Sequence, residues 1–290
     1  MGAGARLREL LAGDELVVAP GAYDCLTARM VEHAGFPAVY MTGAGTAASL
    51  GYPDYGLLTM SEMAGNAARI AAAVGVPVIA DADTGFGNEL NVVRTVREYA
   101  AAGVAALHIE DQEFPKRCGH LDDKAVIGAD QFVSRVRAAA EHRPDHDLVL
   151  IARTDARAVH GIEEAIERAN RALEAGADVA FVEAPQTLDE VAEVPRRVDG
   201  PCLLNVVAAG KTPDVGLERA AELGYRVAIV PVLLLAAVLA AGDAALAGLA
   251  NTGGHPDGVP VMPVEQIFER AGAGGWDEVR ARYGVDQPRS

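Results

Sequence analysis

The 290-residue sequence is short of aromatic residues and of positive charge. Aromatic residues make up 5% of the chain, and 41 acidic residues face 25 lysines and arginines, which gives a net charge of −16. Such a chain repels nucleic acid and anionic membrane surfaces, so we expect neither as a partner. A carboxylate substrate would be repelled as well, so its site needs a metal ion or a buried arginine.

Cysteine is also scarce, with only Cys25, Cys118 and Cys202 in the chain. An odd number at long spacings, without a CxxC pair, argues against a disulfide framework or a structural zinc site and favours a cytoplasmic protein. The sequence has no HExxH and no GxSxG, which disfavours zinc-hydrolase and serine-hydrolase chemistry. The N-terminal segment carries both charge signs and predicts an amphipathic helix rather than a signal peptide.

The most apolar stretch, 227–249, is long enough to raise the question of a membrane span. It contains Pro231 and Asp243, and it divides into a short apolar strand and an alanine-rich helix. We therefore expect a buried strand and helix here, and no membrane partner.

A recurring unit organises the rest of the chain: a helical stretch ends in glycine, and a short apolar run follows. The runs are short enough for strands buried on both faces. We predict strands near 17–19, 38–41, 78–80, 106–109, 148–152, 179–182, 203–204 and 227–230. Helices are predicted between them, for example over 61–73, 89–102, 129–141 and 162–175.

Eight such units in one chain predict a (β/α)8 TIM-type barrel over residues 1–250. A doubly wound open sheet is the alternative, but no GxGxxG turn follows an early strand. Residues 251–261 are rich in glycine and proline and indicate a connector, and 263–283 again predicts a helix. We expect this C-terminal region, 251–290, to pack on a partner subunit.

Polar residues end nearly every predicted strand, where a barrel carries its chemistry. Asp81, Asp83 and Glu110 are acids that would repel one another without a cation, so they predict a hard divalent metal, Mg²⁺ or Mn²⁺. The alternative is that these acids cap the following helices, and Asp83 is the best candidate for such a cap. Arg153 follows an apolar strand and can hold a carboxylate, or pair with Glu183, or do both.

Cys118 stands in the segment Lys-Arg-Cys-Gly-His, within a polar loop from about Asp111 to Gly128. Loops of this length in barrels are often lids over the active site. The neighbouring cations and His120 are expected to lower the pKa of the thiol and make it reactive, and Gly119 gives the backbone freedom. The GAGT segment at 43–46 could hold an anion on its N–H groups.

Taken together, several motifs resemble the isocitrate lyase/phosphoenolpyruvate mutase superfamily. They occur in the order of that family over nearly the whole predicted barrel: SLGYPDYG at 49–56, DADTGFGN at 81–88, ALHIEDQ at 106–112, KRCGH at 116–120, ARTDAR at 152–157, FVEAP at 181–185 and NVVAAGKTP at 205–213.

The resemblance implies a helix-swapped barrel that assembles as a dimer of dimers, and Mg²⁺ near Asp54, Asp81, Asp83 and Glu110. It also implies a substrate pocket formed by Thr42, Gly43, Ala44, Asp81, Gly119, His120, Arg153, Glu183 and Asn205. The KRCGH form is typical of the carbon–carbon lyases of the family. Here NVVAAG stands after the seventh strand, and no arginine occurs between Val227 and Asn251, so a 2,3-dimethylmalate-type dicarboxylate is preferred over a tricarboxylate.

The implied reaction is cleavage of a 2-hydroxy dicarboxylate, of the 2-alkylmalate or 2-methylisocitrate type, into a 2-keto acid such as pyruvate and a carboxylic acid. We predict Cys118 as the general acid, Tyr40 as the candidate base, and Arg153 and Glu183 as further catalytic residues. The alternative is oxaloacetate decarboxylation or P–C bond chemistry on phosphonopyruvate or carboxyphosphonoenolpyruvate in the same site.

Overall fold

The computed structural model describes residues 2–121, 123–144 and 147–284, so residue 122 of the predicted loop and residues 285–290 lie outside it. Its contacts divide the chain into two units, Met1–Ala237 and Val238–Ser290. We describe each unit by itself. The boundary falls within one long helix, thirteen residues before the predicted boundary at 250.

The first unit is built on parallel strands that follow one another around a barrel. Within the described residues there are eight: β1 (Val17–Ala22), β2 (Val39–Met41), β3 (Val78–Asp81), β4 (Ala106–Glu110), β5 (Val149–Thr154), β6 (Val179–Val182), β7 (Leu203–Asn205) and β8 (Val227–Val230). They are ordered β6-β5-β4-β3-β2-β1-β8-β7. A parallel bridge between Ala180 and Cys202 joins the two ends of this order, which confirms the predicted (β/α)8 barrel.

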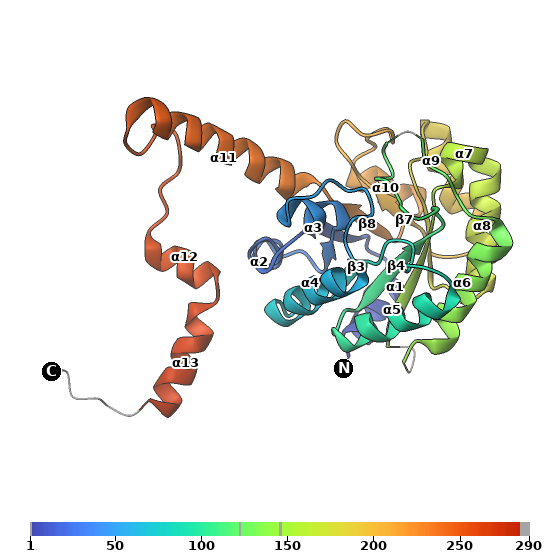
Figure 1. The fold of residues 1–290 in the computed structure, drawn as a ribbon, viewed down its shortest axis with the longest axis horizontal. Helices are drawn as coiled ribbons and strands as arrows, with labels where there is room; N and C mark the ends of the chain where they lie inside the picture. The colour runs from blue at the N-terminus through green and yellow to red at the C-terminus, as the bar shows by residue number, and fades with distance from the viewer. Residues whose placement is uncertain (1, 122, 145–146, 285–290) are drawn as a thin grey trace. The chain divides into compact units, whose positions relative to one another are not determined.

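Helices connect the strands and lie outside them. Their bounds are α1 (Ala3–Ala12), α2 (Cys25–His33), α3 (Gly43–Ser49), α4 (Met60–Ala73), α5 (Glu89–Ala101), α6 (Ala129–His142), α7 (Ala156–His160), α8 (Ile162–Glu174), α9 (Leu188–Arg197) and α10 (Leu217–Leu223). Figure 1 shows α4, α5, α6 and α8 along the outer side of the strands. Asn88 caps α5 by accepting from the N–H of Leu90, so Asp83 does not cap this helix.

Two layers of buried side chains hold the barrel together. One apolar cluster joins strand residues such as Tyr40, Ile79 and Phe181 with Leu7 of α1. A second cluster packs the other face of β1–β5 against helices, with Phe132 of α6 fully buried. Asp178 links α1 to α6 and β5. Its carboxylate accepts hydrogen bonds from Arg8 of α1, from Arg143 directly after α6, and from the N–H of Leu150 in β5. The carboxyl ends of the strands are left free for a site.

The C-terminal unit is helical, and its helices bury nothing by themselves. Helix α11 (Leu233–Thr252) begins in the first unit, and α12 (Val264–Arg270) and α13 (Ala273–Tyr283) follow. None of the described residues in these three helices is buried. By length and composition alone, α11 could cross a membrane. The single helix predicted over 263–283 is wrong, because Gly272 adopts a φ of 93° and separates α12 from α13.

Candidate active site

A small cavity lies where the barrel strands end. Its volume of about 80 Å³ suits a small metabolite, since one water molecule needs roughly 10–15 Å³ by the same measure. It is lined by Tyr40, Thr42, Ala44, Asp54, Asp81, Cys118, Gly119, His120, Arg153, Glu183, Asn205, Val207, Pro231 and Val232. The structure therefore brings together residues from six of the seven separate motifs found in the sequence.

Asp81 ends β3 and organises the segment beside it. Its Oδ1 accepts from the N–H of Asp83 at 2.9 Å, and its Oδ2 accepts from the N–H of Gly43 at 3.2 Å. A side chain at Gly43 would overlap the Asp81 carboxylate, so this approach requires glycine. Burial alone would raise the pKa of Asp81, but His108 and nearby cations outweigh it and lower the pKa to about 2.

Lys116 of the loop is a buried cation that the sequence did not assign to the site. Its Nζ lies 2.5 Å from Asp54 Oδ1 and 2.8 Å from Asp83 Oδ1. Asp83 is buried, and burial together with the neighbouring Asp81 raises its pKa to about 6, against the opposing effect of Lys116. The backbone of Asp83 has a φ of 46°, an uncommon conformation for a residue with a side chain.

Glu110 ends β4 and is fully buried, with neither carboxylate oxygen in a hydrogen bond. Its Oε2 lies 3.2 Å from Nη1 of Arg153. Burial raises the pKa of Glu110, although Arg153 and Lys116 oppose this shift. A buried carboxylate without hydrogen-bond donors is costly unless a cation compensates it.

The predicted metal ligands fit a hydrated divalent cation better than a fully protein-bound one. Among the described residues, no three acids, histidines or cysteines converge closely enough to hold a metal ion alone. Asp81, Asp83 and Glu110 nevertheless offer carboxylate oxygens, the donors that Mg²⁺ prefers, and Glu110 has unpartnered oxygens. Mg²⁺ commonly keeps several waters, so these acids can hold it partly through water.

Arg153 is the penultimate residue of β5 and provides the arginine cation of the cavity. Its Nε donates to Asp155 Oδ2 at 2.9 Å, and its guanidinium lies 5.2 Å from the centre of the Phe181 ring. Glu183 is more distant, at 3.9 Å. Arg153 therefore forms the ion pairs that the sequence allowed, and it also lines the cavity, while its role in holding a substrate carboxylate stays a prediction.

Tyr40 and His108 are buried with their rings stacked, and Tyr40 lines the cavity. The Tyr40 hydroxyl lies 2.8 Å from His108 Nε2 and 3.4 Å from Asp81 Oδ2. Burial, followed by the charge of Asp81, raises the pKa of Tyr40. Burial lowers the pKa of His108 to about 4. Tyr40 thus rests as a neutral phenol, which makes it a hydrogen-bond donor and a poor resting base.

The loop after β4 places Cys118, Gly119 and His120 on the cavity wall. A Cβ on Gly119 would overlap Glu183 and come within 2.5 Å of Arg153 Nη2, so only glycine allows this approach. The expected lowering of the thiol pKa is wrong. Burial raises the pKa of Cys118, because the thiol is desolvated while Lys116 pairs with Asp54 and Asp83.

Glu183 and Asn205 complete the cavity from β6 and β7. The Asn205 amide donates to both Glu183 oxygens, at 3.3 and 3.2 Å. His120 Nε2 lies 3.3 Å from Glu183 Oε1, so the loop and the strand ends meet at this carboxylate. Ala184, directly after Glu183, has a φ of 54°, a second uncommon conformation at this end of the barrel.

Three predicted residues do not line the cavity: Gly43, Asp83 and Glu110. The N–H groups of Gly43 and Asp83 donate to the lining residue Asp81, and Glu110 pairs with the lining residue Arg153. Sequence reasoning gave no site role to Lys116, Lys124, Asp155 or the apolar residues Val207 and Val232. Asp155 could have been found as a polar residue after β5, but the partners of the loop lysines depend on where the loop lies.

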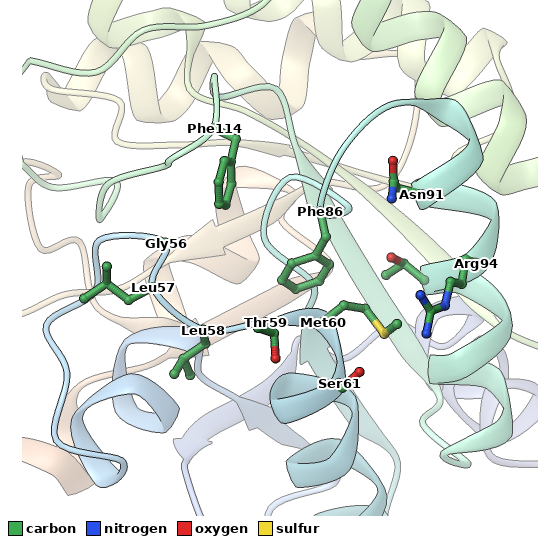
Figure 2. A pocket seen from close by; sticks show the side chains of 11 residues that line it. Gly56, Leu57, Leu58, Thr59, Met60, Ser61, Phe86, Asn91, Arg94 and Phe114 are labelled. Carbon is green, nitrogen blue, oxygen red and sulfur yellow. The ribbon is translucent and has the colours of Figure 1, made fainter.

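A larger cavity of about 350 Å³ lies between the start of α4, helix α5 and the loop. Figure 2 shows Phe114 of the loop and Phe86 facing this space, with Arg94 and Asn91 on α5. None of the predicted catalytic or metal-binding residues lines it, and it has no carboxylate. The chemistry therefore belongs to the smaller cavity despite its size.

Comparisons with known proteins agree with this fold. The phosphoenolpyruvate phosphomutase family matches residues 7–250. The chain is 48% identical to 2,3-dimethylmalate lyase from Eubacterium barkeri over 232 residues, which is 80% of each chain. It is 46% identical to 2-methylisocitrate lyase from Aeropyrum pernix over 251 residues, 87% of this chain and 81% of that protein.

Solved structures give the same result. An oxaloacetate acetylhydrolase bound to 3,3-difluorooxalacetate superimposes with a TM-score of 0.93 at 41% identity, covering 98% of each chain. A phosphonopyruvate hydrolase complexed with oxalate and Mg²⁺ gives a TM-score of 0.88 at 31% identity, covering 98% of this chain and 99% of that one. The chain therefore belongs to the isocitrate lyase/phosphoenolpyruvate mutase superfamily and is an enzyme of the carbon–carbon lyase class.

Proposed function

We propose that this protein is a Mg²⁺-dependent lyase that cleaves a 2-hydroxy dicarboxylate into a 2-keto acid, such as pyruvate, and a carboxylic acid. One observation carries the proposal: Cys118, Arg153 and Asp81 line a single small cavity. This places a proton donor, a carboxylate-binding cation and a metal-binding acid within reach of one substrate. The 2,3-dimethylmalate lyase and 2-methylisocitrate lyase relatives support the same substrate class.

Arg153 holds a substrate carboxylate, since its planar guanidinium can form two parallel hydrogen bonds with one. Thr42 and Ala44 on one side, and His120 and Asn205 on the other, border the same space and orient the bound molecule. Gly43 supports this wall through its hydrogen bond to Asp81, and Glu183 holds Asn205 and His120 in place.

Asp54, Asp81, Asp83 and Glu110 are the residues that would hold Mg²⁺, or Mn²⁺ in its place. When bound, the ion lowers the pKa of the substrate 2-hydroxyl and offsets the charge of the buried acids. The unpartnered oxygens of Glu110 and the raised pKa of Asp83 support a cation-binding role for these acids.

Cys118 supplies the proton that the carbon fragment takes up after the bond breaks. The raised pKa of its thiol suits this role, because the thiol keeps its proton at neutral pH until a stronger base forms. Tyr40 remains our candidate for the proton of the 2-hydroxyl. As a neutral phenol it accepts that proton only while it passes its own to His108, 2.8 Å away.

The walls of the cavity favour an alkyl-substituted dicarboxylate. Val207, Pro231 and Val232 form an apolar side that suits alkyl groups. Among the described lining residues, Arg153 is the one lysine or arginine, so a third carboxylate would lack a partner. We therefore prefer a 2-alkylmalate to 2-methylisocitrate.

A substrate panel tests this function. Alkylmalates, 2-methylisocitrate, oxaloacetate and phosphonopyruvate are each incubated with Mg²⁺, and keto-acid release is followed with a coupled dehydrogenase. We expect turnover of an alkylmalate that disappears with a chelator. Turnover of oxaloacetate or phosphonopyruvate alone would replace the proposal with the decarboxylase or P–C bond alternative.

Replacement of Cys118 tests its role within that reaction. Cys118→Ala and Cys118→Ser should lower kcat by about 10²–10⁴-fold, the usual contribution of a positioned acid. Cys25→Ser is the matched control, because this cysteine lies on α2 and does not line the cavity. Equal turnover in the wild type and the Cys118 variants would reject the assignment.

The exposed apolar helices support an oligomer, which we propose to be a helix-swapped dimer of dimers of a cytoplasmic enzyme. Leu239, Leu246, Phe268 and Trp276 are all more than half exposed, which a second copy of the chain would correct. Sedimentation of the purified protein should give a tetramer without detergent. A monomer, or extraction only with detergent, would contradict this assembly and point instead to α11 as a membrane segment.

A further inference from the structure

The loop over the cavity sends a second lysine into the barrel, away from the acids that Lys116 contacts. The side chain of Lys124 is 1% exposed. Its Nζ donates to Asp155 Oδ1 at 2.7 Å and to the backbone carbonyl of Gly119. One ammonium group therefore joins the barrel wall to the residue that directly follows Cys118.

Asp155 connects this lysine to the substrate-binding arginine. Its Oδ2 accepts from Arg153 Nε at 2.9 Å while its Oδ1 receives Lys124. Asp155 is itself fully buried, and its N–H donates to Asp111 Oδ1 at 2.7 Å. The acceptor for Lys124 is thus held rigidly by the barrel, whereas Lys124 belongs to the loop.

The Lys124–Asp155 ion pair can break without leaving either charge buried and unpaired. If the loop lifts, Lys124 returns to water, and Asp155 keeps Arg153 as its counter-ion. Neither charge is left buried alone, which is the costly outcome when a buried pair is broken. The contact can therefore open and close without unfolding the barrel.

We propose that Lys124 is a positioning residue that holds the described part of the loop, residues 111–121 and 123–128, over the cavity and so places Cys118 for proton transfer. It acts through Asp155 and the Gly119 carbonyl and does not touch the substrate. The role in proton transfer rests on the proposed function, but the role in holding the loop does not.

The test compares Lys124→Met and Lys124→Gln with the wild type, and Arg117→Met is the matched control. Arg117 is an exposed cation of the same loop, next to Cys118, and its side chain forms no ion pair among the described residues. The rate of Cys118 alkylation by iodoacetamide is measured by peptide mass spectrometry. Cys202, buried at 1% exposure on the barrel wall, reports general loosening in the same sample.

We expect both Lys124 variants to be alkylated at Cys118 about tenfold to a hundredfold faster, the range for losing one charge-assisted hydrogen bond. Alkylation of Cys202 and the melting temperature should remain as in the wild type, and Arg117→Met should change neither cysteine. Equal Cys118 rates in wild type and variants would overturn the proposal. A parallel rise at Cys202 would overturn it too, because Lys124 would then stabilise the fold.

Turnover separates this proposal from the proposed function. With the alkylmalate found by the substrate panel, the Lys124 variants should lose kcat by about tenfold or more while KM changes less. Faster alkylation with unchanged kcat would leave Lys124 as the residue that holds the loop and would count against Cys118 as the acid. If no substrate of the panel turns over, the alkylation rates still decide the role of Lys124.

Discussion

Arg153 offers the sharpest test of the electrostatics of the site. In Arg153→Met the side chain keeps much of its length, but the buried cation is lost. The guanidinium lies 2.9 Å from Asp155 and 3.2 Å from Glu110, and both acids are fully buried. Burial would raise the pKa of Asp155, but Arg153 and Lys124 outweigh it, so Asp155 stays ionised. Asp155 keeps Lys124 in this variant, whereas Glu110 loses the arginine with which it pairs.

Removing one partner of a buried ion pair costs about 3–5 kcal/mol. At about 2–4 °C of melting temperature per kcal/mol, the variant should melt about 6–20 °C below the wild type. Arg157→Met is the control, since Arg157 pairs with Glu190 at 2.7 Å but is a fifth exposed, and its loss should cost about 1 kcal/mol.

Urea unfolding at constant pH measures the free energies of unfolding of Arg153→Met and Arg157→Met. Oxalate with Mg²⁺ is the ligand with which binding to the site is measured. The deficit of Arg153→Met should shrink as the pH falls, because protonation neutralises the acids that lost their cation. Oxalate should stabilise the wild type and not this variant. Equal losses of stability in Arg153→Met and Arg157→Met would refute the view that the buried acids depend on Arg153.

Three further outcomes follow from the geometry. Gly119→Ala should lower kcat by at least about tenfold and leave the melting temperature unchanged, because a Cβ there overlaps Glu183; unchanged kcat would contradict the close approach. Mg²⁺ at about a hundred times its Kd should stabilise the wild type against thermal unfolding by about 2.7 kcal/mol, and it should stabilise Glu110→Gln much less. Equal stabilisation of the two proteins would exclude Glu110 as a metal ligand. Asp178→Asn should cost about 1.5–3 kcal/mol by urea unfolding near neutral pH. Burial would raise the pKa of Asp178, but its hydrogen bonds outweigh burial and lower this pKa. The contribution of Asp178 to the free energy of unfolding is therefore present above the pKa of the unfolded chain, about 3.9, and is lost as the pH falls through the lower pKa of the folded protein. A loss of stability in Asp178→Asn that does not depend on pH would contradict this.

The barrel could be predicted because its strands are buried on both faces and stand out as apolar runs. Strands β6 and β8 match their predicted bounds, and the others differ by one to three residues at their ends. The C-terminal region was harder to predict. Gly272 lies in a stretch whose composition is helical, and only its backbone conformation shows that the helix is broken there.

Most of the residues that line the small cavity could be predicted as well, since strand ends converge in a barrel whatever the details of packing. The pairing of charges could not. Sequence places Lys116, Arg117 and Cys118 together, which suggests an activated thiol, but Lys116 turns away to Asp54 and Asp83. The direction of the Cys118 pKa shift depends on where the loop lies, and adjacency in the sequence does not contain that information.

The two buried lysines of the loop have a consequence for the order of events in a catalytic cycle. If the loop lifts as we propose, Lys116 and Lys124 carry two positive charges from the mouth of the barrel into solvent. The proposed dianionic substrate, bound at Arg153, would then add negative charge close to the positions that those lysines leave. That charge would strengthen the attraction that draws the loop back, so substrate binding would itself favour closure. Closure should then weaken as salt rises, and an uncharged analogue of the same shape should leave the loop open.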